Sequence, residues 1–366
     1  MKIGCLTFHN SSNYGSVLQT YALQQIVQSL GYEYEIIDYT TPEKFKFDSL
    51  LRKHKESSWK AYTYKLVSFT YNYFKKQKFV SFSNRYLKVA FPRYRDLKDL
   101  DNIKDTYDYY ICGSDQVWNA TMVRFDSAYF LSFVQNTNKK IAYAASFGRV
   151  ETTNADCMFY KKQLATFEKI SVREQSAQQT VLECANKKAE LVLDPTLLLT
   201  SQQWSELSYG QKVSNEPYIL TYCLSANSEM QAFIRKLSSQ TGYKVIGISR
   251  GVIPMMKEGA YAIPSPLEFV SLFASASYIV TNSFHGTAFS TNLNRNFFTF
   301  IKGDKTSATN SRIVDFLESV GLQDRLRTTC LSGIIELGSP NYRKVNVILD
   351  EKREKSVEFL KQALNN

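Results

Sequence analysis

A histidine stands at the start of a predicted helix in the stretch YIVTNSFHGTAFS, residues 278–290. The apolar run that opens this stretch predicts a buried strand, and the segment after Gly286 predicts a helix. His285 therefore lies where strand ends and helix N-termini bind ligands. Histidine is the usual general acid or base near neutral pH, so we expect chemistry here. The alternative is a histidine that makes only structural hydrogen bonds.

A second polar loop, GSDQVWN, follows the strand-like run YDYYIC at residues 107–112. In this loop Asp115 can orient a sugar hydroxyl or take its proton, and Trp118 can stack on a sugar ring. Alternatively, Asp115 caps the next turn and Trp118 belongs to the core.

Two further loops carry groups that suit anions. Arg173 follows a short strand and precedes a helix, where a guanidinium can bind phosphate or carboxylate through two parallel hydrogen bonds. Asn13 and Gly15 follow the first strand and can offer a side-chain amide and backbone N–H groups. The alternatives are an internal ion pair between Arg173 and Glu174, a helix cap at Asn13 and a tight turn at Gly15.

The formal charge of +11 is concentrated in one segment. Residues 43–104 contain sixteen Lys or Arg against six Asp or Glu, a net +10, so the rest of the chain contributes only +1. This local basicity argues against nucleic acid as a partner. Many aromatic residues accompany it, a mixture that suits an anionic membrane surface. The alternative is a helical insert whose aromatics pack on the body and whose lysines are simply solvated.

The chain shows no secretion or membrane signal and no metal-ligand pattern. It has no apolar run of eighteen residues and no basic-then-apolar leader, so we expect a soluble, cytoplasmic protein. The six cysteines form no CxxC pairs, which predicts buried free thiols rather than a zinc site or a disulfide framework. The three histidines have no ligand spacing, so no metal site is expected.

Alternating strand and helix patterns run through the chain twice, with a polar linker expected at residues 201–217. The predicted fold class is α/β, with two Rossmann-like domains facing a cleft. We expect an N-terminal domain at 1–205, carrying the basic aromatic insert 43–104, and a C-terminal domain at 206–340. A helix at 341–366 is expected to return to the first domain.

Six segments in one order resemble the polysaccharide pyruvyl transferase family: IGCLTFHNSSNYGSVLQTYAL, YDYYICGSDQVWN, KIAYAASFG, ISVREQSA, LVLDPTLLL and TNSFHGTAFS. The resemblance covers nearly the whole chain except 43–104. It implies a GT-B-like enzyme that transfers a pyruvyl group from phosphoenolpyruvate to two hydroxyls of a sugar, as a ketal, in capsule or exopolysaccharide biosynthesis. Phosphoenolpyruvate is then the donor substrate, and no cofactor is implied. His285 matches the family's catalytic histidine, Arg173 its phosphate-binding arginine and Asp115 its acidic residue.

The chain departs from the family pattern at Ser283, where better-studied members have an arginine. A serine hydroxyl donates one neutral hydrogen bond but cannot neutralise a dianion. Arg312, Lys302 and Arg250 are candidates for the missing positive charge.

The expected partners are phosphoenolpyruvate and a sugar acceptor, either free or lipid-linked. Segment 43–104 would allow peripheral contact with the cytoplasmic face of a membrane. Two other functions fit the same patterns: a GT-B-like glycosyltransferase that uses a nucleotide sugar, and a non-catalytic saccharide-binding protein.

Overall fold

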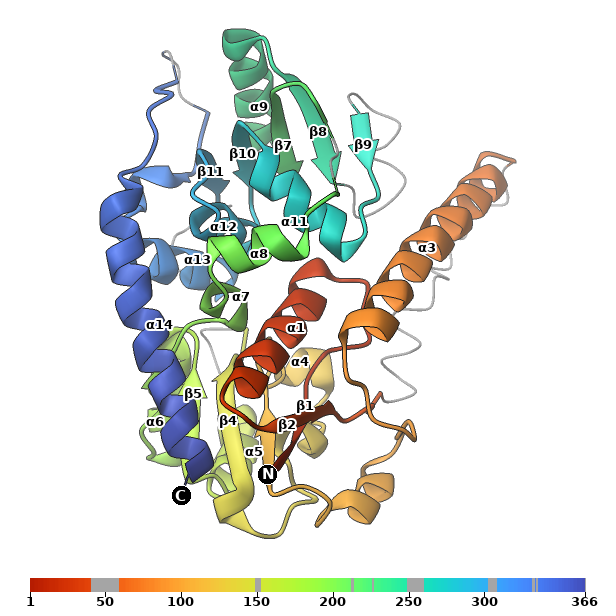
Figure 1. Cartoon of the computed structure of the whole chain (residues 1–366), viewed down its shortest axis with the longest axis vertical. Helices are drawn as coiled ribbons and strands as arrows, with labels where there is room; N and C mark the ends of the chain where they lie inside the picture. Colours follow the sequence, from red (N-terminus) through yellow and green to blue (C-terminus); the bar gives the residue numbers. More distant parts are fainter. Residues whose placement is uncertain are drawn as a thin grey trace.

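The computed structural model contains two six-stranded parallel sheets, each flanked by helices (Figure 1). It describes residues 1–40, 59–148, 153–211, 214–225, 227–248, 260–301, 308–330, 333 and 335–365. The predicted α/β class with two Rossmann-like domains is confirmed. Residues 43–58 of the basic insert, Arg250 and Lys302 lie outside this description.

The first sheet has the strand order β2-β1-β3-β4-β5-β6. Its strands are β1 (Lys2–Leu6), β2 (Glu33–Ile36), β3 (Tyr109–Cys112), β4 (Lys140–Ala145), β5 (Lys169–Val172) and β6 (Glu190–Leu191). The helices of this half are α1 (Tyr14–Ser29), α3 (Trp59–Tyr86), α4 (Ala120–Val123), α5 (Asn154–Leu164), α6 (Gln175–Ala185), α7 (Pro195–Leu198) and α8 (Ser201–Leu207), with 3₁₀ turns at Leu97–Ile103, Ser127–Phe130 and Thr137–Lys139.

The second sheet has the strand order β12-β11-β10-β7-β8-β9. Its strands are β7 (Tyr218–Tyr222), β8 (Lys244–Ile248), β9 (Ala260–Ala262), β10 (Tyr278–Thr281), β11 (Phe297–Phe300) and β12 (Leu326–Arg327). The accompanying helices are α9 (Ser228–Thr241), α11 (Pro266–Ser275), α12 (Phe284–Asn292), α13 (Ala308–Ser319) and α14 (Tyr342–Asn365), with a 3₁₀ turn at Gln323–Arg325.

In each sheet, the chain adds strands first on one side of the starting strand and then on the other. The two sides meet at a switch point, which lies between β1 and β3 in the first sheet and between β7 and β10 in the second. In open parallel sheets, ligands bind outside the carboxyl ends of the strands at such points. The β1 and β3 loops carry Gly15 and Asp115, and the β10 loop carries His285. The topology therefore directs the predicted site residues of both halves toward one region.

One buried hydrophobic cluster extends across both halves of the molecule. Tyr14 at the start of α1 stacks on Phe269 of α11 with ring centroids 4.4 Å apart, and Trp204 of α8 meets Phe289 of α12 at 5.1 Å. The predicted linker 201–217 thus contains a helix, SQQWSEL, whose Trp204 is wholly buried and whose Leu207 also packs against the cluster. This packing holds the two sheets against each other.

The last helix, α14, runs along both halves (Figure 1). Near its end, the Ala363 carbonyl accepts a hydrogen bond from Lys169 at the start of β5 (2.7 Å), and Ser356 Oγ accepts one from the backbone N–H of Leu193 (2.9 Å). Earlier in α14, Arg353 donates to Asn292 Oδ1 of α12 (2.7 Å). The helix therefore bridges the second half and the first.

The cysteine prediction is wrong for one pair. Cys157 of α5 and Cys184 of α6 form a disulfide, with Cα atoms 4.8 Å apart. The reason is that α5 and α6 lie side by side, which residue spacing does not reveal. Cys5, Cys112, Cys223 and Cys330 are free thiols. Within the part of the chain described, no helix has the length and apolar character needed to cross a membrane.

Candidate functional site

His285 lies in the first turn of α12, immediately after β10. Ser283 is the N-cap of this helix, and its hydroxyl accepts a hydrogen bond from the backbone N–H of Gly286 at 3.3 Å. Gly286 packs so closely on Thr281 that a Cβ there would lie 2.3 Å from Thr281 Oγ1. The sequence NSFHG thus forms a tight elbow that fixes the imidazole at the end of the strand.

The imidazole reaches across to the first half of the molecule and touches the start of α1. A Cβ added to Gly15 would lie 2.1 Å from His285 Nδ1, so only glycine allows this approach. Asn13 caps α1 by accepting a hydrogen bond from the Gly15 N–H at 3.0 Å, and its side chain is exposed. Asn13 therefore adopts its structural alternative, a helix cap, whereas Gly15 lies in the first turn of α1 and forms the seat for the histidine.

Behind the histidine lies a buried group of charges from the first half. Arg173, at the end of β5, donates to Asp194 Oδ2 at 2.5 Å and to Asp115 Oδ1 at 3.3 Å. The Glu174 carboxylate lies 3.5 Å from Arg173 Nε. Asp115, held at φ 73°, also accepts hydrogen bonds from the Ser16 hydroxyl (2.5 Å) and the Gln116 N–H (2.9 Å). Both Asp115 oxygens are thus engaged within the protein.

The ionisation of these groups follows from their contacts. Burial alone would raise the pKa of Asp194, but the neighbouring His285 and Arg173 outweigh it and hold that pKa well below its ordinary value. The pKa of Asp115 is likewise lowered, because Arg173 and His285 outweigh its burial. For Arg173, burial would lower the pKa, but Asp194, Asp115 and Glu174 together raise it. The core of the group is therefore ionised at neutral pH.

Arg173 does not have the exposed position expected for a ligand-binding arginine. Its side chain has no accessible surface, and it is surrounded by three carboxylates, so the internal ion-pair alternative describes it. Its guanidinium also lies 5.0 Å from the centre of the Phe284 ring, which comes from the second half. Arg173 is thus an anchor between the two halves.

The prediction that Trp118 stacks on a sugar is wrong. Its ring has no exposed surface and packs parallel to Phe130 at 5.2 Å, and its indole N–H donates to the Tyr129 carbonyl. Trp118 therefore belongs to the hydrophobic core, which is the alternative given above.

The second half also contributes Arg312 of α13. Burial, followed by repulsion from Arg173, lowers the pKa of Arg312, while Glu174 and Asp115 oppose that shift. Arg312 therefore interacts electrostatically with the buried charges of the first half.

Four buried polar atoms in this region have no hydrogen-bond partner among the described residues: His285 Nε2, Arg312 Nε, Arg173 Nε and Glu174 Oε2. The nearest carboxylate oxygen to His285 Nε2 is Asp194 Oδ2, at 3.7 Å, which is too far for a hydrogen bond. Buried polar atoms normally have partners, so such a concentration is typical of a site that completes its bonds with a ligand. We call the region of His285, Gly15, Asp115, Arg173, Asp194 and Arg312 the seam.

The sequence patterns did not single out Asp194, a member of the seam, or Ser16, whose hydroxyl donates to Asp115. Asp194 is the fourth residue of the segment LVLDP and also caps α7 by accepting from the Thr196 N–H at 3.0 Å. An aspartate directly after a strand and before a proline was an available signal, although it equally predicts a helix cap. Ser16 follows Gly15 in the helix and had no distinguishing signal.

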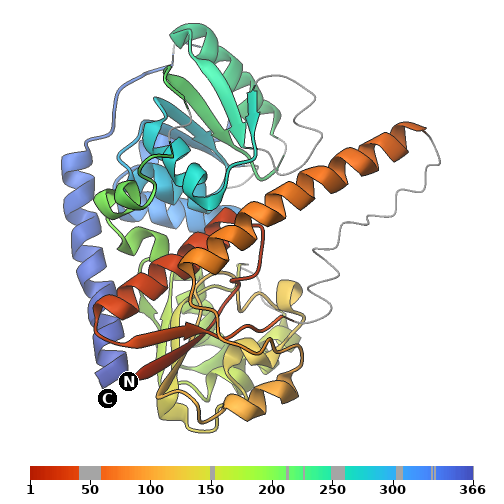
Figure 2. The same ribbon diagram turned by 45° about the vertical axis from the view of Figure 1, so that its right-hand side comes forward.

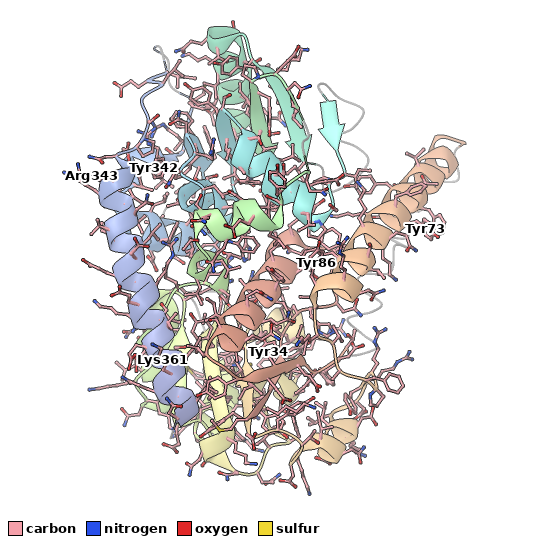
Figure 3. All side chains as sticks on the ribbon, viewed as in Figure 1. Tyr34, Tyr73, Tyr86, Tyr342, Arg343 and Lys361 are labelled. Atoms are coloured by element: carbon pink, nitrogen blue, oxygen red, sulfur yellow. A yellow bond between two sulfur atoms is a disulfide. The ribbon has the colours of Figure 1, made fainter. Side chains whose placement is uncertain are left out.

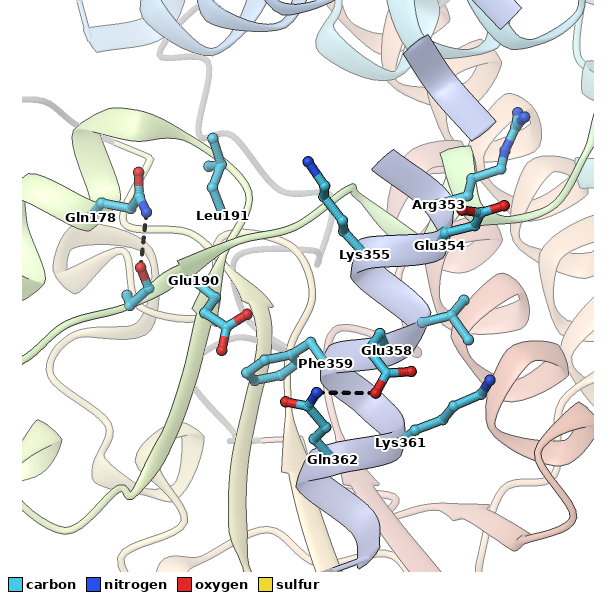
Figure 4. A pocket seen from close by; sticks show the side chains of 12 residues that line it. Gln178, Glu190, Leu191, Arg353, Glu354, Lys355, Glu358, Phe359, Lys361 and Gln362 are labelled. Atoms are coloured by element: carbon cyan, nitrogen blue, oxygen red, sulfur yellow. Dashed lines mark hydrogen bonds between the residues drawn. The ribbon is translucent and has the colours of Figure 1, made fainter. Parts of the chain in front are cut away.

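Two hollows lie along α14, and the smaller one adjoins the seam. A cavity of about 220 Å³ lies beside Arg173, Asp194 and Phe284 and is also lined by Lys352 and Lys355. A wider, open hollow of about 940 Å³ lies between α14, α6 and β6, where Lys355 and Phe359 face Glu190 and Leu191 (Figure 4). Over the described ranges, no three His, Cys, Asp or Glu side chains are grouped to hold a metal ion.

Comparison with solved structures supports a GT-B-like fold. The UDP-GlcNAc 2-epimerase of Methanocaldococcus jannaschii, in complex with UDP-GlcNAc and UDP, superposes with a TM-score of 0.50 at 14% identity, over 100% of this chain and 99% of that one. The ADP-heptose lps heptosyltransferase II of E. coli gives 0.38 at 12% identity, over 97% and 99%. At 14% identity the likeness to the epimerase concerns the fold alone.

Comparison of the sequence with protein families identifies one match. The model of a family described as polysaccharide pyruvyl transferase matches residues 13–301, which include Gly15, Asp115, Arg173, Asp194 and His285. No protein of curated function matches the chain.

Proposed function

Since this chain belongs to the polysaccharide pyruvyl transferase family, we propose that it transfers a pyruvyl group from phosphoenolpyruvate to two hydroxyls of a sugar. One observation carries this proposal: His285 of the second half lies against Gly15 of the first, beside ionised carboxylates, with a buried Nε2 that has no hydrogen-bond partner among the described residues. A histidine held in this way can pass a proton to a bound ligand.

The reaction needs one proton at the methylene carbon of the donor. We assign its delivery to His285 Nε2. The neighbouring carbon then becomes electron-poor, the first sugar hydroxyl adds to it, and the proton of that hydroxyl returns to Nε2. The second hydroxyl attacks the same carbon, and the bond between this carbon and the phosphate oxygen breaks. The proton of the second hydroxyl leaves with phosphate, so atoms and charges balance.

The donor carries a phosphate and a carboxylate, which require cations or N–H groups. We assign this task to Arg312, because its Nε is buried and has no hydrogen-bond partner among the described residues. Arg173 and Asp115 are positioning residues in this scheme. Arg173 is enclosed by carboxylates and stacks on Phe284, the neighbour of His285, so it fixes the elbow that carries the imidazole.

We further propose the biological setting. The acceptor is a sugar of a capsule or exopolysaccharide precursor carried on a lipid, and the reaction takes place in the cytoplasm at the membrane face. The basic aromatic segment 43–104 supports this placement.

The test combines binding and turnover. Phosphoenolpyruvate should raise the melting temperature, whereas UDP- and ADP-sugars should not. With a panel of methyl hexosides as acceptors, the wild type should release phosphate from phosphoenolpyruvate. The rate of phosphate release should be about 10²–10⁴-fold lower in the His285→Ala variant, because general acid catalysis usually contributes a factor of this size. The variant should retain the circular dichroism spectrum of the wild type.

A matched control is His9→Ala, because His9 is buried beside Asp38, a partner outside the seam, at 3.0 Å. It should retain the rate of phosphate release. Full activity in His285→Ala would remove the assignment of that residue. Stabilisation by a nucleotide sugar and not by phosphoenolpyruvate would replace the proposal with a glycosyltransferase.

A further inference from the structure

The long helix α3 carries its aromatic residues on two different sides. One side packs on the body: Tyr71, Phe79 and Phe82 are buried at 4%, 3% and 3% exposure. Another set faces outward: Phe69, Tyr73 and Phe74 are 59%, 51% and 62% exposed, and Val80 is 38% exposed. The alternative of an insert whose aromatic residues pack on the body therefore describes only the inner side of this helix.

The exposed residues form one patch. Phe69, Tyr73 and Val80 are spaced by four and seven residues, so they follow one side of the helix. The Tyr73 ring lies 6.5 Å from Phe69 and 5.8 Å from Phe74. We call Phe69, Tyr73, Phe74 and Val80 the α3 outer patch. Among the residues that the structure describes, the outer end of α3 projects away from the body (Figures 2 and 3).

The charge on α3 has one sign. Its 28 residues include six Lys or Arg and no Asp or Glu. A second copy of this chain that docked patch to patch would bring two such helices together, and like charges oppose that contact. Among the basic side chains of α3 that the structure describes, Lys75 is buried and Lys78 pairs with Glu268, whereas Lys76 and Arg85 are exposed. Exposed aromatic rings on a helix with exposed cations favour an anionic bilayer instead, where the rings enter the interface and the cations meet the headgroups.

The inner side of α3 connects this surface to the seam. Lys78 donates to Glu268 of α11 at 2.9 Å and to the Ile263 carbonyl at 2.8 Å. Phe79 contacts Tyr14 with ring centroids 4.9 Å apart, and Tyr14 directly precedes Gly15, the seat of His285. The helix is thus fixed to both halves of the molecule at the edge of the candidate site.

We propose that the α3 outer patch docks on an anionic lipid bilayer and holds the seam at the membrane surface, so that the enzyme takes a lipid-linked acceptor. The docking stands on the exposed residues and the charge. The lipid-linked acceptor rests on the proposed pyruvyl transfer.

Flotation with vesicles tests the docking without any need for catalysis. The full chain should float with vesicles of 30% phosphatidylglycerol in phosphatidylcholine and not with pure phosphatidylcholine, and salt should weaken the binding. The Phe69→Ser/Tyr73→Ser/Phe74→Ser variant should bind at least about tenfold more weakly, because burial of each aromatic side chain is worth on the order of that factor or more. Its rate with soluble methyl hexosides should equal that of the wild type.

The matched control is Met158→Ser/Tyr209→Ser, which removes two side chains that are 76% and 89% exposed away from α3. This control should float like the wild type. Equal flotation of the triple variant and the wild type would overturn the proposal. Binding of the protein to single-stranded DNA, without binding to vesicles, would also overturn it. A dimer that the triple substitution dissociates would overturn it as well. Vesicle binding by a protein that never turns over phosphoenolpyruvate would instead leave docking in place and remove the pyruvyl transfer.

Discussion

The two walls of the seam differ in how their polar atoms are used. On the first wall, Asp115, Arg173 and Asp194 bond to one another and to Ser16 and the α7 backbone. Arg173 Nε and Glu174 Oε2 of this wall make no hydrogen bond, but they lie 3.5 Å apart as an ion pair. On the second wall, His285 Nε2 and Arg312 Nε have no hydrogen-bond partner among the described residues. The first wall is thus preorganised before any ligand arrives, and the second holds the groups that a ligand would complete. Stability and chemistry are therefore expected to respond to different substitutions.

The largest effect is expected from breaking the first wall. Arg173→Met would leave Asp115 and Asp194 buried without their cation, which typically costs about 3–5 kcal/mol of folding free energy. Urea unfolding measures this loss. Arg173→Lys should not restore stability, because an ammonium cannot reach both carboxylates with a planar fork.

The control for this substitution is Arg235→Met on the exposed face of α9, which should change little. An Arg173→Met protein as stable as the wild type would mean that the first wall does not depend on this pair network.

A second substitution breaks the contact between the walls. Gly15→Ala places a Cβ 2.1 Å from His285 Nδ1, so the imidazole must move. A displacement of about 1 Å at a reacting group lowers rates by about 10²-fold, and we expect this loss in kcat for phosphate release. Gly338→Ala, where an added Cβ meets no atom within 4 Å, is the matched control. An unchanged kcat in Gly15→Ala would contradict the seating of His285.

The second wall is tested by Arg312→Met. Removal of a charge-assisted contact to the donor is worth about 1.5–3 kcal/mol, so KM for phosphoenolpyruvate should rise about 10–150-fold. The stability of the free protein should change less than in Arg173→Met. A large loss of stability without any change in KM would show that Arg312 has a structural role, like the charges of the first wall, and does not bind the donor.

The smallest effect is a pH dependence. The pKa values of Asp115 and Asp194 lie below their ordinary values, so these groups contribute stability that is present above about pH 4 and is lost as the pH falls through the lower folded values. The difference in melting temperature between the wild type and Asp194→Asn should therefore be largest at pH 7 and shrink below about pH 4. For the exposed Asp105→Asn the difference should stay small throughout. A constant difference for Asp194→Asn would contradict the lowered pKa.

The sequence contained most of the fold and part of the seam. The spacing of apolar residues and the polar loops after them predicted the strands that precede His285, Asp115 and Arg173. Parallel strands bring their carboxyl ends to one edge of a sheet, so these residues were expected to lie close together. Local patterns did not reveal which way a loop side chain points, so Trp118 was placed at the site although it fills the core. They also did not reveal Asp194 as a partner of Arg173, because that contact joins strands 21 residues apart in the chain.

The most direct test of the central claim is a crystal structure with phosphoenolpyruvate soaked in. We expect ordered donor in the seam, with its methylene carbon facing His285 Nε2 and its phosphate or carboxylate bonded to Arg312. Donor bound away from His285, or an empty seam in crystals that instead bind a nucleotide sugar there, would contradict the central claim.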